Sequence, residues 1–247
     1  LGRFVGLLCL LPYLWFIWRK KLSKYMIFSG LCLVLLVGAQ GVMGWYMVKS
    51  GLVDRPSVSQ YRLTAHLGVA VAIYALMMWL VLRVSAGLSP ALKVVSGWGW
   101  VLVLGVYTLI LSGGFMAGTD AGFAYPTWPM MGETFVPMGY YADGWQATFE
   151  GVATIHFNHR MLAYAIAILV FLLSVQTLRA SDKPRVRRGA WLMLLALTFQ
   201  VALGIGTVLT QVAIPMAATH QVGAVLLLTA VLYWIHAQTY EKLVISA

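Results

Sequence analysis

Three histidines in this sequence lie inside apolar segments, where an imidazole side chain is costly and therefore indicates a function. They are His66, His159 and His220, each four or five residues from the same predicted end of its segment. The three imidazoles are therefore expected to share one layer of the protein. Two neutral imidazoles that face each other across a helix bundle, such as His159 and His220, can bind the two axial positions of a heme iron. The alternative is that each histidine makes a hydrogen bond to a neighbouring helix.

Other metal sites and other histidines are less favoured. Zinc usually takes four ligands, with thiolates or carboxylates among them, and Cys9 and Cys32 lie elsewhere, in the first two apolar segments. His156 lies three residues before His159 and on nearly the same helix face, so it could replace or assist His159 as a ligand. His236 lies at the opposite end of the last segment and is expected to be an interfacial anchor.

Two arginines lie beside the candidate ligands. Arg160 follows His159, and Arg62 lies four residues before His66. A guanidinium at this position can pair with a heme propionate through two parallel hydrogen bonds. The alternative is that each side chain extends to the lipid head groups.

Seven apolar segments must position these side chains. Each approaches the length of about 20 residues that a membrane-spanning helix requires, and they cover residues 1–18, 26–47, 62–83, 98–118, 155–178, 190–210 and 217–237. Apolar residues make up 61% of the chain and charged residues 10%, with a mean hydropathy of +0.85. This composition excludes an ordinary soluble domain and a disordered chain. It predicts an all-α integral membrane protein.

The charges indicate how the segments are oriented. The net charge of +10 is concentrated in short basic runs after the first, third and fifth segments, which places these runs in the cytoplasm or the mitochondrial matrix. Nucleic acid is therefore not an expected partner. The loop over residues 119–154 carries four acidic residues and no Lys or Arg, so it is expected on the outer side. Its aromatic residues predict either a folded cap or a belt of anchors at the membrane surface.

The sequence also contains an internal repeat. Gln40–Gly44 and Gln200–Gly204 each precede an outer loop and a helix that opens with a histidine, His66 in one case and His220 in the other. Such a repeat predicts two halves of four helices. The expected division is an N-terminal half over 1–118, an outer loop over 119–154 and a C-terminal half over 155–247. The first half then lacks one helix. Either the chain is a fragment and part of the protein precedes Leu1, which is the favoured interpretation, or the first half has lost part of its site.

Four stretches of the chain resemble the heme A synthase family. They are Gly41–Gly51 running on to Tyr61–Gly68, then Gly114–Met131, Phe157–Leu162 and Thr219–Gly223. Any one of these stretches is a weak signal, whereas their combination is specific. Together with the pattern of apolar segments, the resemblance covers essentially the whole chain.

The resemblance implies eight membrane helices in two pseudo-symmetric four-helix bundles, of which seven are present here. It implies that His159 and His220 hold a heme b as cofactor, with Arg160 beside it, and that heme O binds as substrate near His66 and Arg62. The implied reaction oxidises the C8 methyl group of heme O to a formyl group through successive hydroxylation and loss of water. The heme b is expected to relay electrons.

The resemblance also implies what lies outside the printed residues. The family's helix with a Glu-containing His-Arg motif is expected before Leu1, so the catalytic carboxylate is not assigned here and the printed chain is expected to be inactive. The implied partners are the lipid bilayer, heme O synthase, an electron donor and, as one option, a second copy of the chain. The implied location is the bacterial cytoplasmic membrane, in preference to the mitochondrial inner membrane.

Two other functions fit part of the pattern. A membrane b-type cytochrome would hold two permanent hemes, usually at different depths, whereas the three candidate ligands share one depth. A transporter built from repeats would place its site near the middle of the membrane. No Asp or Glu lies inside any of the seven segments, which argues against coupling to protons.

Overall fold

The computed structural model describes residues 2–51, 58–87 and 97–245, and in these ranges it is almost entirely helical. The helices run in the order α1 (Gly2–Trp18), α2 (Lys24–Gly51), α3 (Gln60–Ser85), α4 (Gly97–Gly118), η1 (Ala121–Phe123), η2 (Gly144–Gln146), α5 (Ala147–Glu150), α6 (Val152–Ala180), α7 (Pro184–Leu209) and α8 (Ile214–Ile245). In the described ranges, β-type pairing is confined to one isolated bridge between Met131 and Thr134.

Six of these helices are long and apolar enough to cross a membrane. A helix satisfies all its backbone hydrogen bonds internally, which is why apolar segments take this form in lipid. The segment predicted over 1–18 forms α1, whose apolar part, Phe4–Trp18, is shorter than a typical span. The protein is therefore an all-α, multi-pass membrane protein, and its described residues form six long apolar helices and one shorter apolar helix, α1.

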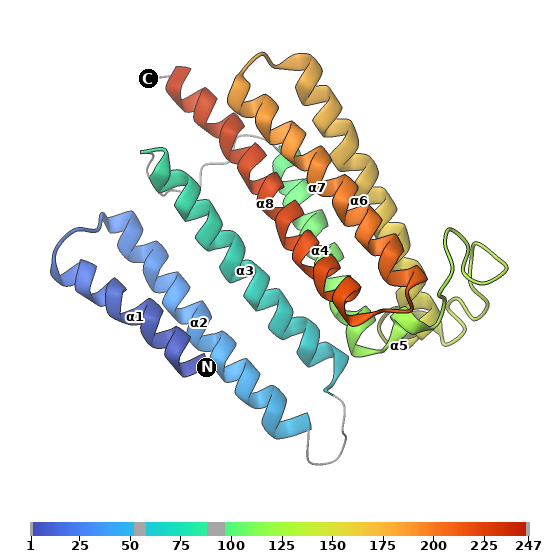
Figure 1. The fold of residues 1–247 in the computed structure, drawn as a ribbon. Helices are drawn as coiled ribbons and strands as arrows, with labels where there is room; N and C mark the ends of the chain where they lie inside the picture. Colours follow the sequence, from blue (N-terminus) through green and yellow to red (C-terminus); the bar gives the residue numbers. More distant parts are fainter. Residues whose placement is uncertain (1, 52–57, 88–96, 246–247) are drawn as a thin grey trace. The chain divides into compact units, whose positions relative to one another are not determined.

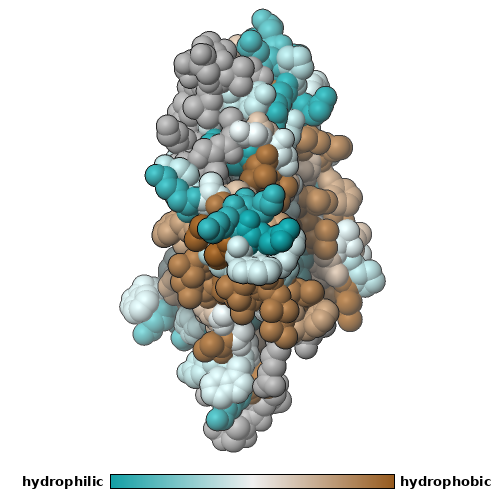
Figure 2. Space-filling model, turned by 90° about the vertical axis from the view of Figure 1, so that its left-hand side faces the viewer, coloured by the Kyte–Doolittle hydropathy of each residue, from teal (hydrophilic) through white to brown (hydrophobic). Residues whose placement is uncertain are grey.

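The long helices expose large apolar side chains on their outer faces, for example Leu35 on α2 and Leu195 on α7. Much of the face drawn in Figure 2 is correspondingly hydrophobic. In a water-soluble protein such a surface would promote aggregation. Here it is the surface that contacts lipid tails.

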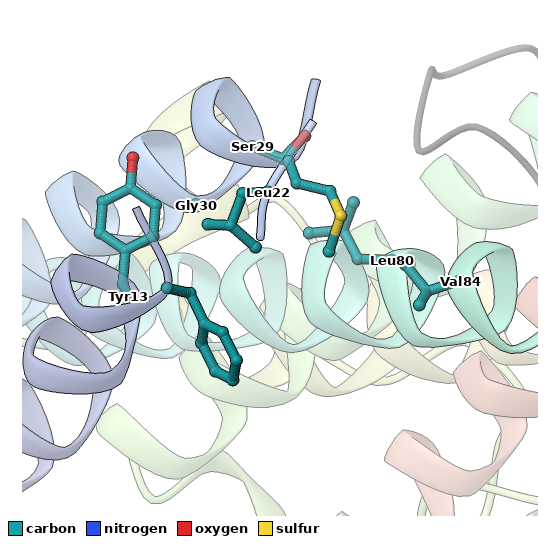
Figure 3. A pocket seen from close by; sticks show the side chains of 8 residues that line it. Tyr13, Leu22, Ser29, Gly30, Leu80 and Val84 are labelled. Carbon is teal, nitrogen blue, oxygen red and sulfur yellow. The ribbon is translucent and has the colours of Figure 1, made fainter. Parts of the chain in front are cut away.

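The first compact unit covers Leu1–Lys93 and contains α1, α2 and α3. Gly30 on α2 lets the ring of Tyr13 approach closely, and the Tyr13 hydroxyl donates a hydrogen bond of 2.6 Å to the carbonyl of Ile27. A cavity of about 180 Å³ opens here, and its lining includes Tyr13, Leu80 and Val84 (Figure 3). His66 lies 14 residues before Leu80 on α3, which is about 21 Å along a helix. The cavity is therefore remote from that histidine.

The second compact unit covers Val94–Ala247 and contains α4, α6, α7 and α8. In this unit α4 packs on α6 and α8, and α7 packs on the same two helices. The structure thus groups α4 with the C-terminal helices, whereas the division drawn from the repeat assigned residues 98–118 to the N-terminal half. Helices joined by short turns pack as antiparallel neighbours, as α7 and α8 do here.

The long loop between α4 and α6 projects beyond the helices of the second unit (Figure 1). It contains η1, η2 and the four-residue helix α5. At its start, Gly122 lies against Val212 in the turn between α7 and α8, where a β-carbon at Gly122 would be 3.0 Å from Val212 Cγ2. The loop is a folded segment fastened to the helices. We refer to residues 119–151 as the cap.

Candidate functional site

The two candidate heme ligands of the second unit lie on helices that do not pack directly together. His159 is on α6 and His220 is on α8, and each of these helices packs against both α4 and α7. Helices α6 and α8 therefore occupy diagonal positions in a four-helix arrangement. His159 lies seven residues after the start of α6, and His220 six after the start of α8, so both are about 10 Å from the end that carries the cap.

The imidazole of His159 is held by a hydroxyl group on α4. Ser112 Oγ lies 2.6 Å from His159 Nδ1, within hydrogen-bond distance, and donates its own proton to the carbonyl of Leu109 at 2.8 Å. Beside it, a β-carbon at Gly113 would be 3.6 Å from His159 Cε1, which is an ordinary packing distance. Helix α4 thus supplies both a polar contact and a small residue to this imidazole.

The imidazole of His220 is held mainly by close packing. A β-carbon at Gly204 on α7 would be 3.0 Å from His220 Cε1. Any residue other than glycine at this position would therefore force the ring to shift. The ring approaches the carbonyl of Gln200, but its buried Nδ1 makes no hydrogen bond in the described part of the chain. His159 and His220 are also close enough to interact electrostatically.

The histidine of the first unit has a different neighbour. Gln40 Nε2 on α2 lies 3.3 Å from His66 Nε2 and donates a hydrogen bond of 3.0 Å to the His66 carbonyl. A β-carbon at Gly44, one turn further along α2, would be 3.2 Å from His66 Cε1. The repeated Gln-and-Gly pattern therefore does place a glycine against a histidine in each unit, Gly44 against His66 and Gly204 against His220.

His156 and Arg160 form a buried pair that fastens the cap. Arg160 Nε donates a hydrogen bond of 3.0 Å to His156 Nε2, and the two side chains are 7% and 1% exposed. The remaining nitrogens of Arg160 donate to carbonyls of the cap, at 3.0 Å to Tyr125, 2.8 Å to Thr127 and 3.2 Å to Met130. The Nε2 of His156 therefore accepts a hydrogen bond from Arg160. The other N–H groups of Arg160, which were expected to pair with a heme propionate, bind the cap instead.

Further bonds join the cap to the same helix. Trp128 Nε1 donates to the hydroxyl of Tyr164 at 3.0 Å, and the backbone N–H of Tyr141 donates to Thr154 Oγ1, also at 3.0 Å. The aromatic residues of the cap thus include anchors that point back to α6. These contacts favour the folded cap over a simple belt of surface anchors.

The other two candidates, Arg62 and His236, each have a partner within their own unit. The guanidinium of Arg62 lies over the ring of Tyr46, 4.8 Å from its centroid, in the first unit. His236 is fully buried in the second unit, with Nδ1 3.4 Å from Nη2 of Arg185. His236 is therefore buried within the protein beside Arg185, near the far end of α8, and its role as an interfacial anchor stays a prediction.

Comparison with known proteins identifies the relatives of this chain. The family model described as cytochrome oxidase assembly protein (COX15-CtaA) matches residues 1–232. The chain belongs to the heme A synthase family.

Several bacterial relatives are named heme A synthase. The protein of Nitrosospira multiformis is 42% identical over 243 residues, which cover 96% of this chain and 68% of that protein. The protein of Rhodospirillum centenum is 41% identical, with 94% of this chain and 63% of that protein covered. The protein of Paramagnetospirillum magneticum is 40% identical, with 95% and 68% covered. The chain therefore spans about two thirds of the length of these relatives.

The structure places two further residues, Ser112 and Gln40, against the candidate histidines. Ser112 was missed although it is a hydroxyl residue within an apolar segment, a placement that by itself deserves an explanation. Gln40 was noted only as part of the repeat. Its contact with His66 depends on how α2 and α3 are rotated about their axes, which the repeat does not specify.

Proposed function

We propose that this chain acts as a heme A synthase, a membrane oxidoreductase that converts the C8 methyl group of heme O to a formyl group. Family membership and relatives of about 40% identity over most of the chain support the activity. In this proposal the second unit holds a resident heme b between His159 and His220. The first unit receives heme O near His66 and Arg62.

The residues of the second unit fit a heme. Two imidazoles at matching depth face the interior from diagonal helices, which is the arrangement that two axial ligands need in a four-helix bundle. Glycines flank both rings, because Gly113 and Gly204 lie against His159 and His220. These small residues let the two imidazoles lie close against α7 and α4. The diagonal pair of imidazoles is the observation that carries the proposal.

A heme bound by this pair would supply one-electron transfer to the oxidation of the substrate. The chain itself supplies the two axial nitrogens, keeps water away with apolar helices and closes the nearby end with the cap. The bonds of Arg160 keep that cap attached to the helix that carries His159.

The first unit fits a substrate that comes and goes. His66 Nε2 lies 3.3 Å from the amide nitrogen of Gln40, so a heme iron must displace this contact before it binds. We therefore expect heme O to exchange at this site. The chain is expected to reside in a bacterial cytoplasmic membrane, with heme O synthase as the source of heme O.

The test is to purify the chain in detergent, extract its hemes and identify them by mass. We expect heme b at about one per chain, with the absorption spectrum of a six-coordinate, low-spin iron. Added heme O should bind and then wash out during gel filtration, while the heme b stays. A folded, monodisperse chain without heme would contradict the proposal. Two hemes that both resist exchange would favour an electron-transfer cytochrome.

A further inference from the structure

One polar group near the proposed heme remains to be explained, the hydroxyl of Ser112. It lies on α4, a helix that contributes no histidine, and its Oγ is 2.6 Å from His159 Nδ1. The same oxygen donates to the carbonyl of Leu109, three residues earlier on the same helix, at 2.8 Å. The hydroxyl thus links the imidazole to a backbone carbonyl through two hydrogen bonds.

The positions of the protons in these two hydrogen bonds follow from the number of protons on each group. A serine hydroxyl has one proton, and a carbonyl can only accept. The proton of Ser112 therefore points to Leu109, and Ser112 Oγ must accept the proton of His159 Nδ1. This assignment fixes one tautomer of His159, with the proton on Nδ1 and the lone pair on Nε2. Such a lone pair is what a heme iron requires of its ligand.

We propose that Ser112 is the positioning residue for His159, fixing its tautomer and ring orientation and making it the more basic of the two axial ligands. This inference rests on the proposed function, because it takes His159 as a heme ligand. A hydrogen bond from the distal nitrogen of a ligating imidazole raises the basicity of the ligand. A more basic ligand stabilises the ferric iron, so Ser112 lowers the midpoint potential of the heme.

The two axial ligands differ in this respect. His220 has a buried Nδ1 that makes no hydrogen bond within the described residues, and its ring is held by contact with Gly204. His159 is therefore fixed by a directed bond and His220 by packing. Removing the bond to His159 should change the electronic properties of the heme without removing a ligand.

The structure offers a matched control for Ser112. Ser174 on α6 is fully buried and donates a hydrogen bond of 2.7 Å to the carbonyl of Val170, but it contacts no histidine by a hydrogen bond. Replacing Ser174 with alanine removes the same kind of group from the interior of the same unit. Only Ser112→Ala removes a hydrogen-bond acceptor from an imidazole, that of His159, whereas Ser174→Ala does not.

The experiment compares the chain carrying Ser112→Ala, Ser112→Thr, Ser112→Cys or Ser174→Ala with the unaltered chain. Potentiometric titration measures the midpoint potential of the low-spin heme, and competition with apomyoglobin measures how tightly the heme is held. We expect Ser112→Ala to shift the potential to more positive values and to weaken heme retention by about tenfold, since support of a metal ligand is worth this much. Ser112→Thr keeps the hydroxyl and should stay near the unaltered chain, as should Ser174→Ala.

The outcomes separate this inference from the proposed function. A Ser112→Ala chain with unaltered potential and retention overturns the role of Ser112 while leaving the heme site in place. An unaltered chain that binds no heme overturns the proposed function itself. If Ser112→Ala does not fold, Ser112→Cys decides, because its thiol is a weak acceptor. It should then shift the potential in the same direction by a smaller amount, and an unchanged potential overturns the inference.

Discussion

The histidines of the two units have similar packing but different hydrogen bonds. In each unit a histidine lies against a glycine of the preceding helix, His66 against Gly44 and His220 against Gly204. In the first unit the Nε2 of the histidine is already in contact with Gln40. In the second, Ser112 engages the opposite nitrogen of His159 and leaves Nε2 as the acceptor atom. In the second unit the hydrogen bond from Ser112 thus holds His159 in position. In the first unit His66 must lose its contact with Gln40 before its Nε2 can bind a heme iron.

The largest effect is expected from removing the ligands of the second unit. His159→Ala or His220→Ala should abolish the low-spin spectrum of the purified chain, because either change leaves the iron with at most one axial imidazole. His66→Ala should leave that spectrum in place and weaken only the binding of added heme O. Absorption and electron paramagnetic resonance spectra of the three variants make the comparison.

A buried histidine outside the proposed site provides the control. His236 is as buried as any side chain of the second unit and contacts Arg185, but it lies near the far end of α8. His236→Ala should keep the low-spin spectrum even if it lowers stability. Loss of the spectrum in His236→Ala, together with its survival in His220→Ala, would show that the ligand assignment is wrong.

The next largest effect concerns the cap of the second unit. Arg160→Ala removes the donors to His156 and to the carbonyls of Tyr125, Thr127 and Met130. Each buried acceptor that is left without a partner costs about 1–3 kcal/mol, and water can reach part of the cap, so we expect a total loss of about 3 kcal/mol. Thermal unfolding in detergent measures this loss, and limited proteolysis should detect release of the cap.

An exposed arginine of the same unit gives the reference value. Arg188 is exposed near the start of α7, and Arg188→Ala should change stability by less than about 0.5 kcal/mol. If Arg160→Ala were no more destabilised than Arg188→Ala, the four bonds of Arg160 would not be holding the cap. Arg160 would then remain available for the propionate pairing expected from the sequence.

The sequence predicts the positions of the helices well, but it does not predict the partners of their polar side chains. The segment predicted over 155–178 forms α6 at Val152–Ala180, and that over 62–83 forms α3 at Gln60–Ser85. Apolar length determines these positions, because lipid requires a helix of about that length. The first predicted segment, residues 1–18, was the shortest of the seven, and it forms the short helix α1. The cap was expected only as one of two alternatives.

The partners of a side chain depend on how each helix is rotated about its axis and on where a loop packs against the helices. Neither can be derived from the composition of the sequence. Ser112 reaches His159 only because α4 presents that face to α6. Arg160 was expected to pair with a propionate because it follows a candidate ligand. Its partners are instead His156, one turn earlier, and carbonyls 30 to 35 residues earlier in the chain. Polar residues inside apolar helices could have been identified as unusual from the sequence, whereas the atoms that satisfy them could not.

A moderate effect is expected from the glycines beside the ligands. Gly204→Ala would place a β-carbon 3.0 Å from His220 Cε1, which forces the ring to move, whereas Gly113→Ala would place one 3.6 Å from His159 Cε1, which is ordinary contact. We expect Gly204→Ala to weaken heme retention on the order of tenfold and Gly113→Ala to leave it nearly unchanged. Equal retention in the two variants would show that His220 is not held by packing.

The smallest effect is expected at the contact that distinguishes the two units. Gln40→Ala removes the amide from His66 Nε2, so a heme added to the first unit no longer displaces it. The loss of one hydrogen bond, about 1 kcal/mol, corresponds to roughly a fivefold gain in affinity. Titration with heme O in chains that also carry His159→Ala measures binding without the bis-histidine site. Gln200→Ala is the matched control, since Gln200 holds the equivalent repeat position.

Gln200 makes no side-chain hydrogen bond to His220 in the described residues, and its Oε1 is buried without a partner. Its removal should therefore leave heme O affinity unchanged. Weaker binding in Gln40→Ala would mean that Gln40 orients His66 for the substrate instead of competing with it. In that case both units support their histidines through the neighbouring helix. The faster exchange expected of the first unit would then not be explained by the contact between Gln40 and His66.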